Sequence, residues 1–265
     1  MATIQQKETS NFYTLLKSST QVVGGCTQIN EELTEQTIST YGQKEFTHIE
    51  KHERFIDIGS AVTLNDLLAL GKHNIPRILY EALETISNPI IRNMATIGGN
   101  VCALKHRHTL YAPLLALDSI LEFKNQTDTQ YVSLYNFSTF KEIPKGFVLS
   151  NIRVANPDAN LSIFRRIGPE HMITPESASY AFLATTGKNI IESVRIAFAG
   201  NFVFRNRELE NSFMGRRLPL TKKDIEEIQL SIRDAFEKTT MNQMVFDVMK
   251  QQFFNLTKYS LEQLM

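Results

Sequence analysis

The sequence predicts an α+β protein built in two parts. Its 265 residues are enough for two domains and for a sizeable buried core. The first part carries two glycine pairs, and each pair follows an apolar stretch. The second part reads as a β-hairpin followed by helices, the arrangement typical of α+β folds. The polar segment 155–162, "ANPDANLS", is the candidate linker between the two parts.

Period and capping residues predict the elements of the first part. A short helix is expected at 9–18, and a buried strand that enters a glycine turn at 21–25. The alternation of apolar and charged residues in 54–59 predicts a strand. Thr63 is a candidate N-cap for a helix over 63–71, with Asp66 in the first turn and Gly71 at its end. Further segments follow in chain order: helices at 76–86 and 110–117, and strands at 119–125, 130–134 and 146–154.

The second part is predicted as a hairpin and two helices. Residues 177–200 read as two strands around a Gly-Lys-Asn turn. Thr221 is a candidate N-cap for an amphipathic helix over 221–236, and a last helix is expected at 242–256. The apolar face of the helix at 221–236 comprises Ile225, Ile228, Ile232, Ala235 and Phe236.

Composition excludes several classes of function. The chain has 28 basic and 28 acidic residues, so it lacks the basic excess of a nucleic-acid-binding surface. Its longest uncharged apolar stretches, such as 110–117, are too short to span a bilayer, and its first ten residues contain no apolar signal core. The expectation is a soluble, cytoplasmic protein with no membrane or nucleic-acid partner.

The cysteine count limits the redox chemistry. Cys26 and Cys102 are the two cysteines, so the chain has no disulfide framework and no four-cysteine iron–sulfur site of its own. A Walker phosphate loop and an HExxH motif are also absent from the sequence, and "FAGNF" at 198–202 lacks the spacing of a dinucleotide fingerprint. If the chain handles electrons, the carrier is something else.

The two glycine pairs lie in "VVGGCTQIN" at 22–30 and "NMATIGGN" at 93–100. Because glycine has no Cβ, a Gly-Gly pair fits a tight turn, and it equally lets another molecule approach the backbone. Two such loops facing each other offer several backbone N–H groups to a pyrophosphate. Both interpretations remain open on the residues alone.

The phrase "NPIIRNMATIGGNV", 88–101, resembles the signature of the FAD-binding medium subunit of molybdenum hydroxylases, a family that includes xanthine dehydrogenase and carbon monoxide dehydrogenase. The similarity extends over nearly the whole chain. Supporting segments are "VVGG", "IDIGSAVTLNDL", "APLLALDSILEF", "FRRIG", the hairpin at 177–200 and "ELENSFMGRRL" at 208–218.

The resemblance implies two domains. Residues 1–155 would form a two-lobed α/β FAD-binding domain of the PCMH type, with lobes at about 1–52 and 53–155. FAD would lie between the lobes, with its pyrophosphate on the two glycine loops. Residues 160–265 would form the C-terminal domain of antiparallel sheet plus helices.

The resemblance also implies a set of cofactor-binding residues. Positions 23–29 and 95–100 would be the two contact regions, and Thr96 and Asn100 would use their side chains as well. Leu149 would pack near the flavin ring, and Arg166 stands where the family usually has Lys. Thr109 lies near the place of a family Asp. The full set is Val23, Gly24, Gly25, Cys26, Thr27, Gln28, Ile29, Ala95, Thr96, Ile97, Gly98, Gly99, Asn100, Thr109, Leu149 and Arg166.

In the family, a molybdenum-cofactor subunit hydroxylates the substrate, and electrons pass through iron–sulfur clusters on another subunit to this FAD and on to NAD or another acceptor. The resemblance implies that role here, with no metal site on this chain. A cofactor supplies its own redox chemistry, which fits a sequence without a recognisable acid–base constellation. Two alternatives stay open: a flavin-poor structural or assembly subunit of such a complex, and a stand-alone flavoprotein oxidoreductase.

The sequence departs from the family pattern in three places. Cys26 interrupts the first loop, as a small filler residue or as a thiol with a lowered pKa that carries covalent flavin. The segment 101–111 is bulky and basic, which motivates the assembly-subunit alternative. Its His106 and His108 read as a solvated loop rather than a metal pair. The third departure is "RIGPEHMITPESAS", 166–179, where the family commonly has a basic residue and Asp, and its Glu170 and His171 read as ordinary loop residues.

Overall fold

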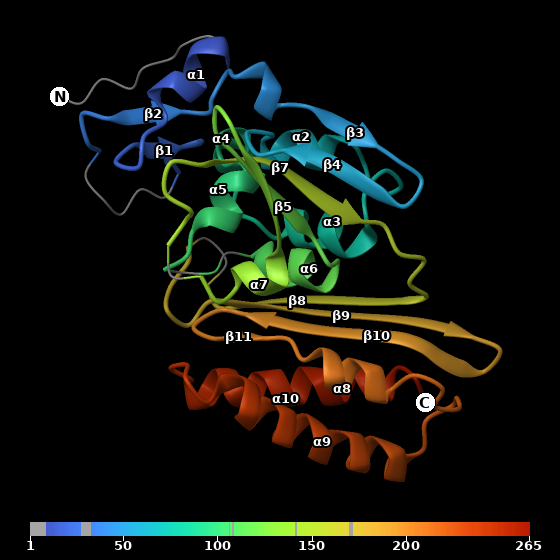
Figure 1. Cartoon of the computed structure of the whole chain (residues 1–265). Helices are drawn as coiled ribbons and strands as arrows, with labels where there is room; N and C mark the ends of the chain where they lie inside the picture. Colours follow the sequence, from blue (N-terminus) through green and yellow to red (C-terminus); the bar gives the residue numbers. More distant parts are fainter. Residues whose placement is uncertain (1–8, 28–32, 106, 108, 141, 170–171) are drawn as a thin grey trace. The chain divides into compact units, whose positions relative to one another are not determined.

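The structure is a computed structural model that describes residues 9–27, 33–105, 107, 109–140, 142–169 and 172–265 (Figure 1). The chain forms two compact units. Unit 1 comprises Met1–Pro76, Ile86–Lys105 and Leu117–Asn156, and unit 2 comprises Arg77–Thr85, His106–Ala116 and Pro157–Met265. Two short segments from the first half of the sequence therefore belong to the second unit.

The N-terminal lobe of unit 1 contains helix α1 (Thr9–Leu15), strands β1 (Gln21–Val23) and β2 (Thr37–Ser39), and the 3₁₀ turn η1 (Lys44–Phe46). Strands β1 and β2 pair in parallel over three residues each. Both strands pack against a small apolar cluster: β2 contributes Ile38 to it, and Val22 of β1 packs on it. The cluster comprises Phe12, Ile38, Phe46, Ala61 and Val148. A two-stranded ribbon is marginally stable by itself, so this cluster is what holds the lobe together.

The centre of unit 1 is a five-stranded antiparallel sheet in the order β3-β4-β7-β5-β6; Figure 1 labels β3, β4, β7 and β5. Its strands are β3 (Ile49–Lys51), β4 (Phe55–Gly59), β5 (Ile120–Lys124), β6 (Thr129–Ser133) and β7 (Val148–Ala155), and α7 (Leu134–Phe137) follows β6. One face is apolar and buried, with residues such as Ile56, Ile58, Ile152 and Phe123. The other face is polar, as alternation along half-buried strands requires.

Three short helices complete unit 1: α2 (Leu64–Ala69), α4 (Pro89–Met94) and α5 (Ile97–Cys102). Thr63 forms a capping box with Asp66 at the start of α2, and Asn88 and Thr96 cap α4 and α5 with their side chains. Each helix therefore begins where a polar side chain satisfies the first free N–H groups.

Unit 2 is built on a four-stranded antiparallel sheet in the order β11-β10-β9-β8. The strands are β8 (Leu161–Ile167), β9 (Ala178–Gly187), β10 (Ile190–Ala199) and β11 (Val203–Phe204). A two-residue turn at Lys188 and Asn189 joins β9 to β10, and both residues have φ near +55° (+51° and +60°).

Both faces of this sheet are covered, so the first seven residues of β9 are all buried. Helices α8 (Arg207–Ser212), α9 (Lys222–Thr240) and α10 (Asp247–Glu262) cover one face through a large aromatic core that includes Phe198, Phe204, Phe236 and Phe253. Helices α3 (Arg77–Glu84) and α6 (Tyr111–Ala116) contact the strands from the other side (Figure 1). Small residues there, Ala181 opposite Ala197, leave room for the close approach of a helix.

Two arginines hold the end of α6 in unit 2. Arg195 donates to the carbonyl oxygen of Ala116 at 3.2 Å, and Arg205 donates to that of Leu115. These carbonyls are among the last four of the helix, which have no partner within it. Arg205 also forms a buried ion pair with Glu210, whose carboxylate accepts from the backbone N–H of Ile196 at 3.0 Å.

The mixed α+β class predicted from the sequence is confirmed, and each predicted helix and strand of the described residues has a counterpart. One predicted burial and some predicted boundaries were wrong. Strand β1 is half-buried rather than buried. The last helix begins at Asp247 rather than 242 and runs to Glu262. In the described part of the chain, no helix is long and apolar enough to cross a membrane.

Candidate functional site

The first glycine loop, 24–27, directly follows β1. Among the described residues, none accepts a hydrogen bond from the backbone N–H of Gly24, Gly25, Cys26 or Thr27. Cys26 has φ of +54°, in the left-handed region that few non-glycine residues occupy. Consecutive amides in such a turn form a concave group of donors that suits an anion.

The two glycine loops touch, and the glycines of the first loop are required for the contact. A Cβ added to Gly25 would lie 1.5 Å from the carbonyl oxygen of Met94, and one added to Gly24 would lie 2.7 Å from Thr96 Oγ1. Neither glycine has a positive φ, so close approach rather than backbone conformation explains both residues. The structure thus brings together the first loop and residues 94–96.

The second glycine pair lies in the first turn of α5 and not in a tight turn, because neither Gly98 nor Gly99 has a positive φ. The amides of this turn have partners within unit 1. Ile97 N donates to Val62 O at 3.1 Å, and Gly98 N donates to Ser60 O at 2.9 Å. Gly99 N donates to Thr96 Oγ1 and Asn100 N to Thr96 O, at 3.1 and 3.0 Å. Of the two loops, as far as the structure describes them, the first therefore supplies the free backbone donors.

The adjacent glycines of the second pair have different surroundings. A Cβ on Gly98 would lie 2.6 Å from the carbonyl oxygen and 2.7 Å from the Cβ of Ser60, so this position packs α5 onto the end of β4. A Cβ on Gly99 would meet one atom, Thr96 Oγ1, at 3.1 Å, and Gly99 is exposed. The open surface beside Gly99 is space that a ligand can use and that a larger side chain would fill.

The segment before the second loop is held by Arg92. Its Nη1 donates to the carbonyl oxygens of Ile86 and Ser87 at 2.9 and 3.0 Å. Ser87 has φ of +45°, and Asn88 then caps α4 by accepting from Ile91 N at 3.0 Å. This arrangement fixes the start of α4, the helix that ends at Met94 and leads to Thr96, the two residues that meet the first loop. The role of Arg92 was not predicted from the sequence, although this arginine lies within the segment 88–101 that resembles the family signature.

The carbonyl oxygens of Ser60 and Val62 were likewise not predicted as part of the site. Both orient α5 by accepting its first amides. The hydroxyl of Ser60 is buried and has no hydrogen-bond partner among the described residues. Their segment, "IDIGSAVTLNDL", resembles the family, but a backbone acceptor leaves no signature in side-chain chemistry.

Cys26 does not have the lowered pKa considered for it. Burial raises the pKa of its thiol, and its Sγ donates to the carbonyl oxygen of Gly24 at 3.4 Å. A thiol in this state is a poor nucleophile at neutral pH. The interpretation as a small residue in the loop agrees with this environment.

The remaining predicted site residues belong to both units. Leu149 is buried in β7 of unit 1, paired with Phe123 of β5. Thr109 and Arg166 belong to unit 2, where the Arg166 guanidinium donates to the carbonyl oxygen of Met172 at 3.1 Å. Their contact with a cofactor stays a prediction.

Several predictions fall on positions outside the described residues: Gln28, Ile29, His106, His108, Glu170 and His171. Within the described ranges, no group of three or more His, Cys, Asp or Glu side chains is placed to hold a metal ion.

The profile of one protein family, described as the FAD binding domain in molybdopterin dehydrogenase, matches residues 1–155, more than half of the chain. The chain belongs to this family. FAD is the cofactor of these domains, and the family consists of oxidoreductase flavoproteins. The recognised phrase and both glycine loops lie inside the matched range.

Individual relatives agree with this family. The glyceraldehyde dehydrogenase medium chain of Sulfolobus acidocaldarius is 23% identical over 186 residues, which are 66% of this chain and 64% of the relative. The xanthine dehydrogenase FAD-binding subunit of Escherichia coli O157:H7 is 33% identical over 84 residues, 31% of this chain and 28% of that subunit. The chain thus spans less than two thirds of the length of these curated relatives.

The fold is shared with a solved structure. The reconstituted CO dehydrogenase from Oligotropha carboxidovorans superposes with a TM-score of 0.78 at 16% identity, covering 97% of this chain and 93% of the other. At this identity the likeness shows the fold alone.

Proposed function

We propose that this chain is the FAD-binding, electron-transfer subunit of a xanthine-dehydrogenase-like molybdenum hydroxylase. In this role it takes electrons from iron–sulfur clusters on a partner subunit and passes them to NAD or another acceptor. Substrate hydroxylation belongs to a third, molybdenum-cofactor subunit. We assign residues 1–155 to the FAD-binding domain and 160–265 to the C-terminal domain, and we place the complex in the cytoplasm.

The observation that carries this proposal is the row of four backbone N–H groups at Gly24–Thr27 without partners among the described residues. Gly24, Gly25 and Thr27 are half-buried and Cys26 is exposed. A half-buried donor without a partner is costly, so such a row is typical of a place where a ligand satisfies the donors. The pyrophosphate of FAD has acceptor oxygens and negative charge suited to these donors. Gly99 is exposed, and a Cβ there would meet Thr96 Oγ1, the atom that Gly24 of the first loop also approaches, so this side is open to the ligand.

The residues of this chain would bind and orient the cofactor. Gly24–Thr27 would donate to the pyrophosphate, and the Thr96 side chain, already the cap of α5, would fix the distance between the two loops. FAD, when bound, supplies the capacity to accept electrons from one carrier and deliver them to another. These 265 residues contain two cysteines, too few for an iron–sulfur cluster, so the clusters that donate the electrons are expected outside them.

A second candidate is a structural or assembly subunit that has lost tight flavin binding. The bulky, basic segment 101–111 favours it, because small residues and an acidic partner are expected there in a member that binds FAD. A stand-alone flavoprotein oxidoreductase is a third candidate. Copurification with iron–sulfur and molybdenum-cofactor subunits would separate the first proposal from the third.

The first experiment is a titration of the purified chain with FAD, followed by flavin absorbance and fluorescence. Saturable one-to-one binding supports the proposal. Gly99→Val is expected to weaken binding at least tenfold, because its side chain enters the open space beside the first loop, while thermal unfolding of the apoprotein stays unchanged. Full affinity in Gly99→Val would refute the glycine cradle. An absence of binding both in the isolated chain and in the reconstituted complex would favour the assembly subunit.

A further inference from the structure

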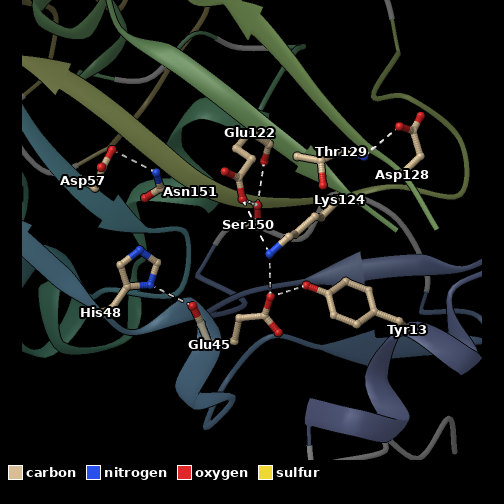
Figure 2. A network of polar contacts seen from close by, with 10 residues as sticks. All are labelled: Tyr13, Glu45, His48, Asp57, Glu122, Lys124, Asp128, Thr129, Ser150 and Asn151. Carbon is tan, nitrogen blue, oxygen red and sulfur yellow. Dashed lines mark hydrogen bonds and ion pairs between the residues drawn. The ribbon is translucent and has the colours of Figure 1, made fainter. Parts of the chain in front are cut away.

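A series of polar contacts joins the N-terminal lobe of unit 1 to the central strands of its five-stranded sheet (Figure 2). The series begins at Tyr13 of α1, whose hydroxyl donates to Glu45 Oε1 of η1 at 2.6 Å. Lys124 of β5 donates to the same oxygen at 3.1 Å. One carboxylate oxygen therefore links two elements that are more than 100 residues apart in the sequence.

The inner end of this series is anchored in the sheet. Lys124 Nζ lies 4.0 Å from Glu122 Oε1, and Ser150 Oγ of β7 lies 2.6 Å from the same Glu122 oxygen and 3.0 Å from the Glu122 carbonyl oxygen (Figure 2). The pairing of β5 with β7 shifts register directly after Glu122. Ser150 occupies this irregularity, so its contact with Glu122 fixes the carboxylate against the backbone of two strands.

The contacts are partly shielded from water, which distinguishes them from ordinary surface ion pairs. The side chain of Glu122 is 18% exposed, that of Glu45 29%, and that of Lys124 37%. Burial, and then the hydrogen bond to Glu45, raise the pKa of Tyr13, so its hydroxyl remains a neutral donor. Lys124 is the cation between the carboxylates of Glu45 and Glu122. Without its positive charge, these two half-buried negative charges would repel each other.

This series acts on the part of the lobe that carries the first glycine loop. After α1 the chain turns back through Thr20, whose side chain donates to Leu15 O at 2.8 Å, and enters β1. Val22 of β1 packs on the cluster of Phe12 and Phe46, the neighbours of Tyr13 and Glu45. Because β1 and β2 pair over three residues each, what holds α1 and η1 in place also holds the loop at 24–27.

We propose that Tyr13, Glu45 and Lys124 are positioning residues for FAD: together they form a clasp that sets the first glycine loop at its working distance from the second. The proposal rests on the proposed function, since it assumes that FAD is the ligand of these loops. It adds three residues that lie outside both glycine loops and would act through the position of the first loop.

The test measures FAD affinity of the full chain by flavin fluorescence at a temperature well below unfolding, together with the visible circular dichroism of the bound flavin. Lys124→Met is expected to raise the Kd about tenfold and to change the dichroism, because the loop loses its fixed position. Lys145→Met is the matched control. Lys145 also lies in unit 1 and pairs with a glutamate, Glu142, at 3.5 Å, but both side chains are at least 70% exposed, and no change is expected.

Two further variants make the result independent of folding defects. Tyr13→Phe keeps the ring that packs on Phe46 and removes the hydroxyl, so it is expected to weaken FAD binding in the same direction and less than Lys124→Met. Lys124→Arg is expected to restore most of the affinity, because a guanidinium also donates to Glu45. In the double variant Tyr13→Phe/Lys124→Met, the loss of FAD affinity should be smaller than the sum of the two single losses, since both residues donate to one oxygen of Glu45.

The outcomes separate the two proposals. If the wild-type chain and its reconstituted complex bind no FAD, the proposed function fails, and the clasp inference fails with it. If the wild type binds FAD and both Lys124→Met and Tyr13→Phe bind equally well, only the clasp inference is overturned. Unfolding at lower temperature with an unchanged Kd would overturn the clasp as well, because the contacts would then be structural alone.

Discussion

Gly98 and Gly99 are adjacent in the sequence, yet the structure gives them different roles. Gly98 allows α5 to pack on Ser60, whereas Gly99 is exposed and a Cβ there would meet one atom, Thr96 Oγ1, at 3.1 Å. We expect Gly98→Ala to lower the free energy of unfolding by about 1–3 kcal/mol, because a Cβ there would collide with backbone atoms that cannot move away cheaply. Gly99→Ala should leave stability nearly unchanged. Urea unfolding of both apoproteins checks this, and equal losses in the two variants would contradict it.

Asp57 is a second residue with a testable role. Burial pushes its pKa up, but hydrogen bonds from Arg153, two at 2.9 Å, and from Asn151 at 3.0 Å outweigh burial, so the pKa is lowered. A carboxyl whose folded pKa is depressed stabilises the fold above its unfolded pKa of about 3.9, and this contribution is lost as pH falls through the folded pKa.

We therefore expect Asp57→Asn to be less stable than the wild type at pH 7, with the difference shrinking as pH falls below about 4. Urea unfolding at a series of pH values measures it. Asp128→Asn serves as the control, since Asp128 lies in an exposed turn of the same unit. A constant difference across the pH range would show that the effect comes from packing rather than from the charge.

At the scale of the elements, helix α8 is fixed by the buried pair of Arg205 and Glu210. Removing one member of a buried pair leaves the other charge uncompensated, at a cost of about 3–5 kcal/mol. Glu210→Ala should show a loss of this size in chemical unfolding, because Ile196 N also loses its acceptor. Glu208→Ala is the matched control on an exposed position of the same helix, and a similar loss there would refute the explanation.

Caps explain which elements could be predicted from the sequence. Thr63 and Thr221 each form a capping box with an aspartate three residues later, and both helices begin where predicted. The last helix has Phe246 before it, which forms no side-chain cap, so its start was misplaced. The helix at 97–102 was not predicted because glycines oppose helix formation locally. Its stability comes from tertiary acceptors, the carbonyls of Ser60 and Val62, that no local pattern reveals.

The same contrast holds for the candidate site. Both glycine loops were found from the sequence, because glycine pairs beside apolar stretches are visible in it. Which of the two loops supplies the free backbone donors could not be predicted, since this depends on which amides already have hydrogen-bond partners in the fold. Tyr13, Glu45 and Lys124 lie far apart in the sequence and carry no motif, so the clasp becomes visible through tertiary contacts alone.

At the scale of the whole molecule, the compact units do not follow the order of the sequence. Helices α3 and α6 come from the first half of the chain and contact the strands of unit 2. The arginines that hold α6 follow its carbonyls by 79 and 90 positions. Sequence patterns describe residues that are close along the chain, so the assignment of α3 and α6 to unit 2 could not be predicted from them.

A truncation tests this organisation. The fragment 160–265 lacks α3 and α6, and one face of its sheet, with Ala181 and Leu183, would be exposed. We expect it to lack cooperative thermal unfolding and to bind a hydrophobic dye, whereas the full chain unfolds cooperatively. A fragment that unfolds cooperatively by itself would show that the two helices are dispensable.

The capture of α6 also has a consequence during synthesis. All six of its residues are buried in the folded protein, and its partner strand β10 ends about 80 residues later. At roughly 5–20 residues per second, the ribosome needs about 4–17 s to supply that strand. Throughout this interval the nascent chain contains the segment that forms α6 but not strand β10, against which this segment is buried in the folded protein. The segment 111–116 is therefore where a chaperone would be expected to engage this protein first.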